Sequence, residues 1–161
     1  MMGKENSVEK ITLKKVKDFD FTLNPNISVG KFRFGRNIDE YVLGYSFKFF
    51  EPNSKLEDDA GKYSNEELGL TLFIDKSKLI SNIFCKKYCF YKGVNLIGLN
   101  IDKFIAKFEL LPNKIEKFLV YLNESEIQNQ TAYDIDDLGI SLWTYRKKIL
   151  KVTCQNGSDN A

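Results

Sequence analysis

The chain has 161 residues, of which 43% are hydrophobic and 14% are aromatic, and this composition excludes a disordered chain and favours a single folded domain. Its 24 lysines and arginines nearly cancel its 22 acids, so the net charge of +2 lacks the basic excess expected of a nucleic-acid binder. There is no histidine, the commonest general base and a frequent zinc ligand. We therefore expect a protein that is not an enzyme, with no catalytic residue and no cofactor.

The first half of the chain predicts strands around one short helix. Apolar stretches at 11–13 and 19–23 indicate a leading strand or hairpin before the turn at 24–26. Asn37 follows a strand-like stretch and precedes an amphipathic pattern, which is typical of a helix N-cap. Leucines at 68, 70 and 72 then alternate with Gly69, Thr71 and Phe73, and a polar turn at 75–78 leads into 79–85. That pattern predicts a β-hairpin.

The second half predicts a similar series. Asn100 is again a candidate N-cap, and apolar residues at 101, 104, 105 and 108 give the stripe of a helix buried on one face. Pro112 limits this helix to about Leu111. Residues 118–122 are consistent with a strand or with a helix that begins near Asn113. Alternation at 138–142, a turn at 145–148 and an apolar run at 149–154 predict a second hairpin.

The two series align with each other, which indicates an internal duplication. Residues 34–42 match 97–105 at an offset of 63, with four of nine positions identical. Residues 67–73 match 137–143 at an offset of 70, with three of seven identical. We therefore predict one domain over 1–161, with repeats at approximately 27–85 and 94–154. The expected fold class is α+β, with two tandem copies of a helix followed by an antiparallel β-meander, packed as one domain.

The three cysteines are Cys85, Cys89 and Cys154. Cys85 and Cys89 could supply two metal ligands, but without histidine a four-ligand zinc site would need a carboxylate. Reduced thiols packed in strands are the preferred interpretation, and no metal site is expected. No apolar run is long enough for a signal peptide or a transmembrane helix, so we expect a cytoplasmic protein with no membrane contact.

Charge is unevenly distributed along the chain. Residues 124–137 contain five acids and no lysine or arginine, residues 51–67 are also acidic, and lysines gather at the predicted hairpin tips. This pattern predicts an acidic rim opposite a basic rim, as suits an oriented protein contact, although charged loops could equally serve solubility alone. Strand parity places two aromatic residues on the face away from the core, where they are candidate anchors unless another segment covers them. The candidate partner-binding residues are Glu57, Asp58, Asp59, Glu124, Glu126, Asp134, Asp136, Asp137, Trp143 and Tyr145.

Three segments carry a family resemblance. Residues 27–41 and 95–102 resemble the turn-and-helix entry of small bacterial inhibitor proteins, and Tyr133-Asp134-Ile135-Asp136-Asp137-Leu138-Gly139-Ile140-Ser141-Leu142-Trp143 resembles a strand motif of proteins encoded beside polymorphic toxins. The chain thus resembles an immunity protein of a contact-dependent growth-inhibition or related toxin system. More loosely, its tandem modules are similar to β-lactamase inhibitory protein.

The resemblance implies binding to the C-terminal domain of a cognate toxin, with a nuclease as the expected target and no direct contact with nucleic acid. A nuclease site is basic because it binds phosphates, so an acidic rim could occlude it. The alternative is a non-catalytic adaptor or interaction module without a toxin partner. A small-molecule-binding or enzymatic domain is a third possibility, and it would require a deep pocket with convergent polar groups.

Overall fold

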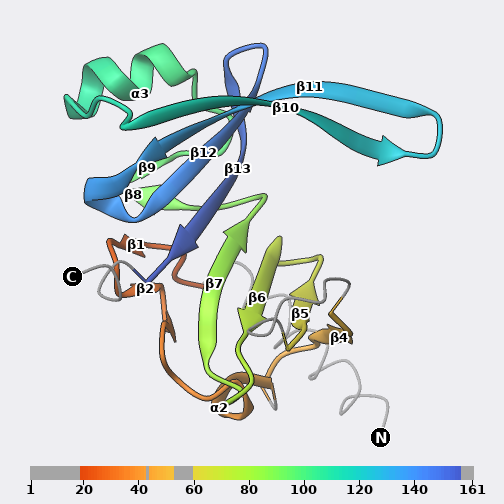
Figure 1. The fold of residues 1–161 in the computed structure, drawn as a ribbon. Coiled ribbons are helices and arrows are strands. Elements are labelled where there is room, and N and C mark those ends of the chain that lie inside the picture. The colour runs from red at the N-terminus through yellow and green to blue at the C-terminus, as the bar shows by residue number, and fades with distance from the viewer. Residues whose placement is uncertain (1–18, 43, 53–59, 157–161) are drawn as a thin grey trace, which may run out of the picture.

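A computed structural model describes residues 19–42, 44–52 and 60–156. One antiparallel sheet of eight strands dominates the structure, in the order β10-β11-β12-β13-β7-β6-β5-β4 (Figure 1). Its strands are β4 (Lys48–Phe50), β5 (Lys62–Asn65), β6 (Leu70–Ile74), β7 (Ile80–Cys85), β10 (Lys114–Asn123), β11 (Glu126–Ile135), β12 (Ile140–Tyr145) and β13 (Lys148–Gln155).

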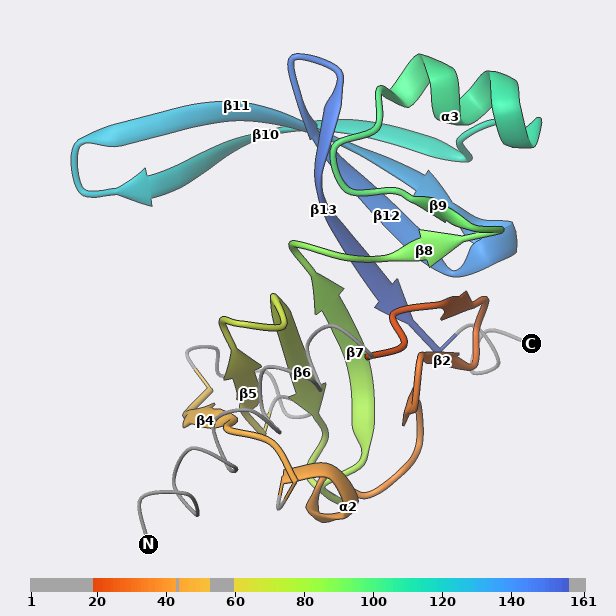
Figure 2. The ribbon, with the colours of Figure 1, turned by 180° about the vertical axis from the view of Figure 1, so that it is seen from behind.

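The smaller elements lie beside this sheet. They are β1 (Leu23–Asn24), β2 (Ser28–Val29), β3 (Phe32–Arg33), α2 (Asp39–Val42), β8 (Phe90–Tyr91), β9 (Val94–Asn95) and α3 (Ile101–Phe108). Strands β1 to β3 form one small sheet and β8 with β9 forms another. Figure 2 shows that both small sheets lie against the same face of the large sheet.

Alternating side chains give the large sheet one buried face and one open face. In β6 and β12 every second residue is buried, including Leu70, Leu72 and Leu142, and these residues pack with Phe32 and Phe104 in one hydrophobic core. The residues between them are only partly buried. The predicted parity of both strands is therefore confirmed, and the partly buried residues belong to the open face.

The pairing of β13 with β7 joins the two halves of the chain into one sheet. Val152 lies opposite Cys85 and Cys154 lies opposite Ile83, and all four side chains are buried. Strands β4 to β7 and strands β10 to β13 therefore share one uninterrupted hydrogen-bonded ladder.

The predicted fold class is wrong. Within the described residues the structure is 51% strand and 12% helix with only two α-helices, and its main feature is the large antiparallel sheet rather than two tandem helix-plus-meander modules. The first expected helix shrinks to the four residues of α2, followed closely by Gly44. Glycine disfavours the helix, and a single turn has little stability of its own. The strands of the two expected meanders meet across β13 and β7 instead of forming separate modules.

Backbone hydrogen bonds nevertheless recur at the aligned positions. The N–H of Gly35 donates to the carbonyl oxygen of Ile80 at 2.9 Å, and the N–H of Gly98 donates to that of Ile149 at 2.7 Å. The two glycines have φ values of 78° and 90°, a left-handed region that only glycine adopts without strain. Each aligned segment is thus attached to the last strand of its own half of the chain, β7 or β13.

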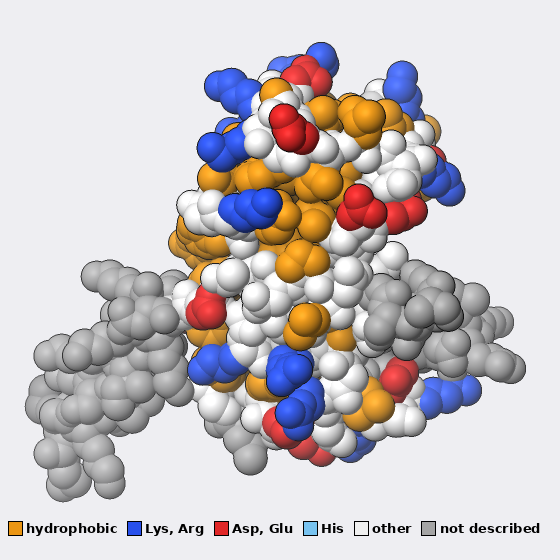
Figure 3. All heavy atoms as spheres, turned by 90° about the vertical axis from the view of Figure 1, so that its left-hand side faces the viewer, with side chains coloured by type: hydrophobic (Ala, Val, Ile, Leu, Met, Phe, Trp, Pro, Cys, Tyr) orange, Lys and Arg blue, Asp and Glu red, His pale blue; other side chains and the backbone are white. Residues whose placement is uncertain are grey.

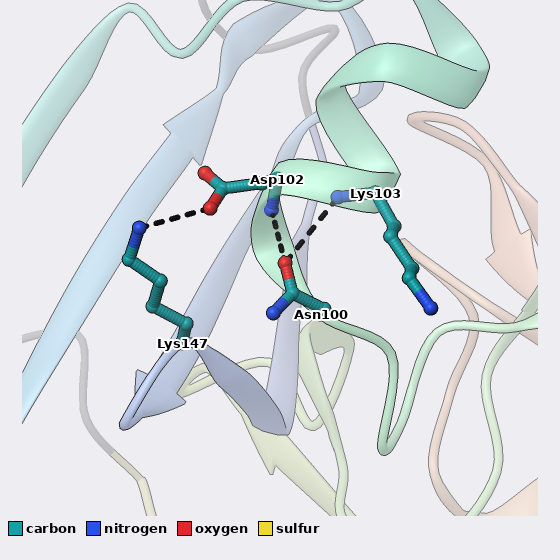
Figure 4. A network of polar contacts seen from close by, with 4 residues as sticks. All are labelled: Asn100, Asp102, Lys103 and Lys147. Carbon is teal, nitrogen blue, oxygen red and sulfur yellow. Dashed lines mark hydrogen bonds and ion pairs between the residues drawn. The ribbon is translucent and has the colours of Figure 1, made fainter.

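Helix α3 begins where the sequence predicts and ends earlier. The side chain of Asn100 accepts hydrogen bonds from the backbone N–H groups of Asp102 and Lys103, at 2.8 and 3.4 Å (Figure 4). Lys147 reaches across from the β12–β13 turn to the carboxylate of Asp102 at 2.9 Å. The helix stops at Phe108 because Glu109 adopts a left-handed conformation with φ of 54°, so it does not extend to Leu111.

Other sequence predictions have mixed outcomes. Residues 118–122 form part of a strand, β10, and not a helix. The leading segment contributes the two residues of β1, while residues 11–13 lie outside the described residues. None of the helices in the described ranges is long and apolar enough to cross a membrane.

Replacing the N-cap residue tests the local origin of α3. Asn100→Ala removes the acceptor for two N–H groups and is expected to lower the free energy of unfolding by about 1 kcal/mol, measured by urea denaturation. Lys103→Ala keeps its backbone N–H and should change that free energy by less than about 0.5 kcal/mol. Equal effects of the two substitutions would show that the cap contributes nothing specific.

Candidate protein-binding surface

The hairpin of β10 and β11 extends beyond the rest of the sheet. Only Thr131–Ile135 of β11 pairs with β12, whereas β10 and β11 stay paired with each other as far as Asn123 and Glu126. The length of the hairpin that does not pair with β12 forms an arm, defined here as residues 118–130, which projects from the body in both ribbon views (Figures 1 and 2). The arm is therefore a two-stranded ribbon that the rest of the described chain contacts only at its root.

Large hydrophobic side chains are concentrated on this arm. Half of the ten exposed large hydrophobic residues of the described chain belong to it, and Tyr121 and Leu119 are 72% and 63% exposed. Tyr121 pairs with Ile127, so these two share one face with Leu119, while Phe118 and Leu122 lie on the other. Contiguous apolar surface of this kind marks an interaction site in a soluble protein.

The opposite end of the body has a different character. Figure 3 views that end, and its lysines, arginines, aspartates and glutamates are interspersed around a group of hydrophobic side chains. The projecting shape distinguishes the arm from this surface.

Trp143 connects the arm to the body. Its ring lies 5.0 Å from that of Phe118, centroid to centroid, and its Nε1 donates to the hydroxyl of Thr153 at 3.4 Å. The ammonium group of Lys151 lies over the same ring at 4.6 Å. Trp143 is thus part of the open face at the root of the arm. Tyr145, the second predicted anchor, is half-buried beside the β12–β13 turn, with the guanidinium of Arg146 5.0 Å from its ring centroid.

The predicted acidic residues fall into two groups. Glu124 and Glu126 are exposed at the tip of the arm, where Glu126 accepts a hydrogen bond from Asn123 at 3.3 Å. Asp134, Asp136 and Asp137 lie at the other end of β11 or just after it. At about 3.4 Å per residue, the eight steps from Glu126 to Asp134 span about 27 Å, so the structure does not bring the two groups together.

The three aspartates at the base of the arm differ in exposure, and one of them already has a hydrogen-bond partner within the chain. Asp134 is half-buried and accepts a hydrogen bond from Ser141 at 2.6 Å, whereas Asp136 and Asp137 are exposed. The remaining predicted acids, Glu57, Asp58 and Asp59, lie outside the described residues.

The three thiols meet in the core. Cys85, Cys89 and Cys154 are fully buried and free, and their sulfur atoms lie within 4.8 Å of one another. Hydrogen bonds from the thiols of Cys154 and Cys85 lower the pKa of Cys89, while the hydrogen bond to Cys154, together with burial, raises the pKa of Cys85. No carboxylate joins this group within the described ranges, so its donors do not complete a four-ligand zinc site. The three free thiols pack against one another in the hydrophobic core.

Burial predicts slow reaction of these thiols. Ellman's reagent should modify all three cysteines at once in concentrated urea but react with the folded protein only at the rate of its opening, because thiolate access controls the reaction. Rapid modification of the native protein would contradict the buried placement of Cys85, Cys89 and Cys154.

The contact between the arm and the body can be followed through Trp143, the only tryptophan of the chain. Phe118→Ala removes the ring beside the indole and should shift its fluorescence emission to longer wavelength through added water contact. Leu119→Ala, on the other face of the same strand, is the matched control and should leave the emission unchanged. Identical spectra for Phe118→Ala and the parent would contradict the contact.

Comparison with family models, curated proteins and solved structures finds no match to this chain. The proposed function therefore rests on the chemistry of the surfaces described above.

Proposed function

We propose that this chain is a cytoplasmic immunity protein that neutralises a cognate toxin domain, and that the arm is the part that enters the toxin. The observation that carries the proposal is the arm itself, a projecting ribbon with exposed apolar sides. Each Å² of apolar surface removed from water contributes about 25 cal/mol, so these side chains favour a bound state. The body contacts only the root of the arm, at Phe118, and the rest of the ribbon extends away from it.

The charge of the arm favours a basic cleft as its binding site. Its tip carries Glu124 and Glu126, and no lysine or arginine occurs between Phe118 and Tyr145. A nuclease concentrates positive charge where it holds phosphates, so an acidic tip can be steered there while the apolar sides pack against the cleft walls. Inhibition would then be occlusion of the substrate site.

The root of the arm supports a rigid mode of entry. The β10–β11 pairing is continuous from Lys114 to Tyr121, and the Phe118–Trp143 contact attaches the ribbon to the sheet. A segment that is already ordered loses less conformational entropy on binding than a flexible loop. An arm that is already ordered before binding therefore favours tight inhibition.

The first experiment identifies the partner. A tagged copy of the chain captures binding proteins from its host lysate, and each captured protein is expressed alone and then together with the chain. The proposal requires a captured protein that kills cells alone and is neutralised by co-expression. If every captured protein is harmless to cells, the immunity function is wrong.

Charge reversal then tests the arm. Glu124→Lys with Glu126→Lys should slow association with the toxin at least about tenfold at low salt, because the steering charge changes sign. Asp136→Lys with Asp137→Lys changes the net charge equally at the base of the arm and should slow association less than about threefold. Stopped-flow binding measures both rates, and equal slowing by the two variants would contradict entry by the tip.

A further inference from the structure

The open face of the large sheet contains a groove lined by lysines. The groove has a volume of about 550 Å³ and lies over β4, β5 and β6 and the turn after β7. Its charged lining residues are four lysines and one acid, namely Lys48, Lys62, Lys86, Lys87 and Glu66. These lysines come from three separate places in the sequence and meet only in the folded sheet.

The four lysines have no carboxylate partner in the described part of the chain. The ion pairs there join Arg36 to Glu40, Lys114 to Glu116 and Lys147 to Asp102, and none of them reaches the groove. Lys87 donates only to a backbone oxygen, that of Glu67, at 3.4 Å. The described lining carries four ammonium groups against the single carboxylate of Glu66, so its net charge is positive and favours a bound anion.

Lys151 provides a second sign of this potential. Its pKa is lowered, first by burial and then by the positive charges of Lys86 and Lys62. Two of the groove lysines therefore also repel the ammonium group of Lys151 on β13.

Aromatic rings alternate with the lysines on the same face. Lys62 lies 5.7 Å from the ring centroids of both Phe50 and Phe73. Lys151 lies between Phe84 and Trp143, at 5.3 and 4.6 Å. The ring centroids of Phe73 and Phe84 are 4.5 Å apart, so one aromatic series runs from β4 to β12. The rings hold the ammonium groups in place but supply no formal negative charge.

We propose that this groove and the adjoining aromatic series bind single-stranded nucleic acid. Phosphates would pair with the lysines, and unpaired bases would stack on accessible rings, of which Phe50 is 39% exposed. The Ser64 and Thr71 hydroxyls, 2.7 Å apart, lie in the lining as further polar partners. A duplex fits less well because its bases are stacked inside it. The overall charge of +2 conceals this site because acids elsewhere cancel the sum.

Fluorescence anisotropy with a labelled oligothymidylate of about 20 nucleotides tests the proposal. Binding should weaken with salt, and a plot of log affinity against log salt concentration should have a slope of about −3 if the four groove lysines each neutralise one phosphate. A duplex of the same length should bind at least about tenfold more weakly, because its bases cannot reach the rings.

Two double variants with equal charge change locate the site. Lys62→Glu with Lys86→Glu should reduce affinity at least about tenfold, whereas Lys103→Glu with Lys107→Glu, on exposed positions of α3, should change it less than about threefold. Phe50→Leu should weaken binding about tenfold with an unchanged salt slope, because it removes stacking and not charge. If the first variant does not fold, Lys48→Gln with Lys87→Gln, both at exposed positions, takes its place.

Three results would overturn the proposal. They are absence of binding at low salt, equal loss in the α3 variant, or binding of poly-L-glutamate as tight as that of the oligonucleotide, which would indicate an acidic protein as the ligand. All variants leave Glu124 and Glu126 intact, so failure here would not affect toxin binding by the arm.

Discussion

The hydrogen-bonded pairing of β13 with β7 is the interaction on which the rest of the structure depends. It joins the four strands β4 to β7 to the four strands β10 to β13 in one sheet. With it, Ile83, Cys85, Val152 and Cys154 form the centre of one core, and the small sheets close over that face. A single continuous ladder also determines that all side chains on the other face lie on one shared surface.

The two surfaces proposed to bind partners lie at different ends of this sheet. The arm offers apolar sides and an acidic tip, whereas the groove at the far edge offers lysines and rings. Trp143 lies between them, in contact with Phe118 on one side and Lys151 on the other. The opposite charges of the tip and the groove are kept apart by the width of the sheet, so neither neutralises the other.

Local features were predictable from the sequence because they depend on neighbouring residues. The N-cap at Asn100 and the alternation in β6 and β12 follow from short-range patterns, and the structure confirms them. The arm was not predictable, because it arises where the ten-residue β11 extends beyond the six-residue β12. The pairing register of these two strands is not visible in the sequence of either strand alone. The groove was missed for a similar reason, since Lys48, Lys62 and Lys86 come together only through strand order.

The position of β10 at the border of the sheet has a consequence for the solubility of the protein. An outer strand with free backbone groups is a template on which other chains can polymerise, and an apolar one is especially hazardous. Near its start β10 carries Lys114, Glu116 and Lys117, and the first two form an ion pair along the strand. Charges at such a border oppose the addition of another strand. These charges therefore protect the chain against growth into fibres even though the arm exposes apolar side chains.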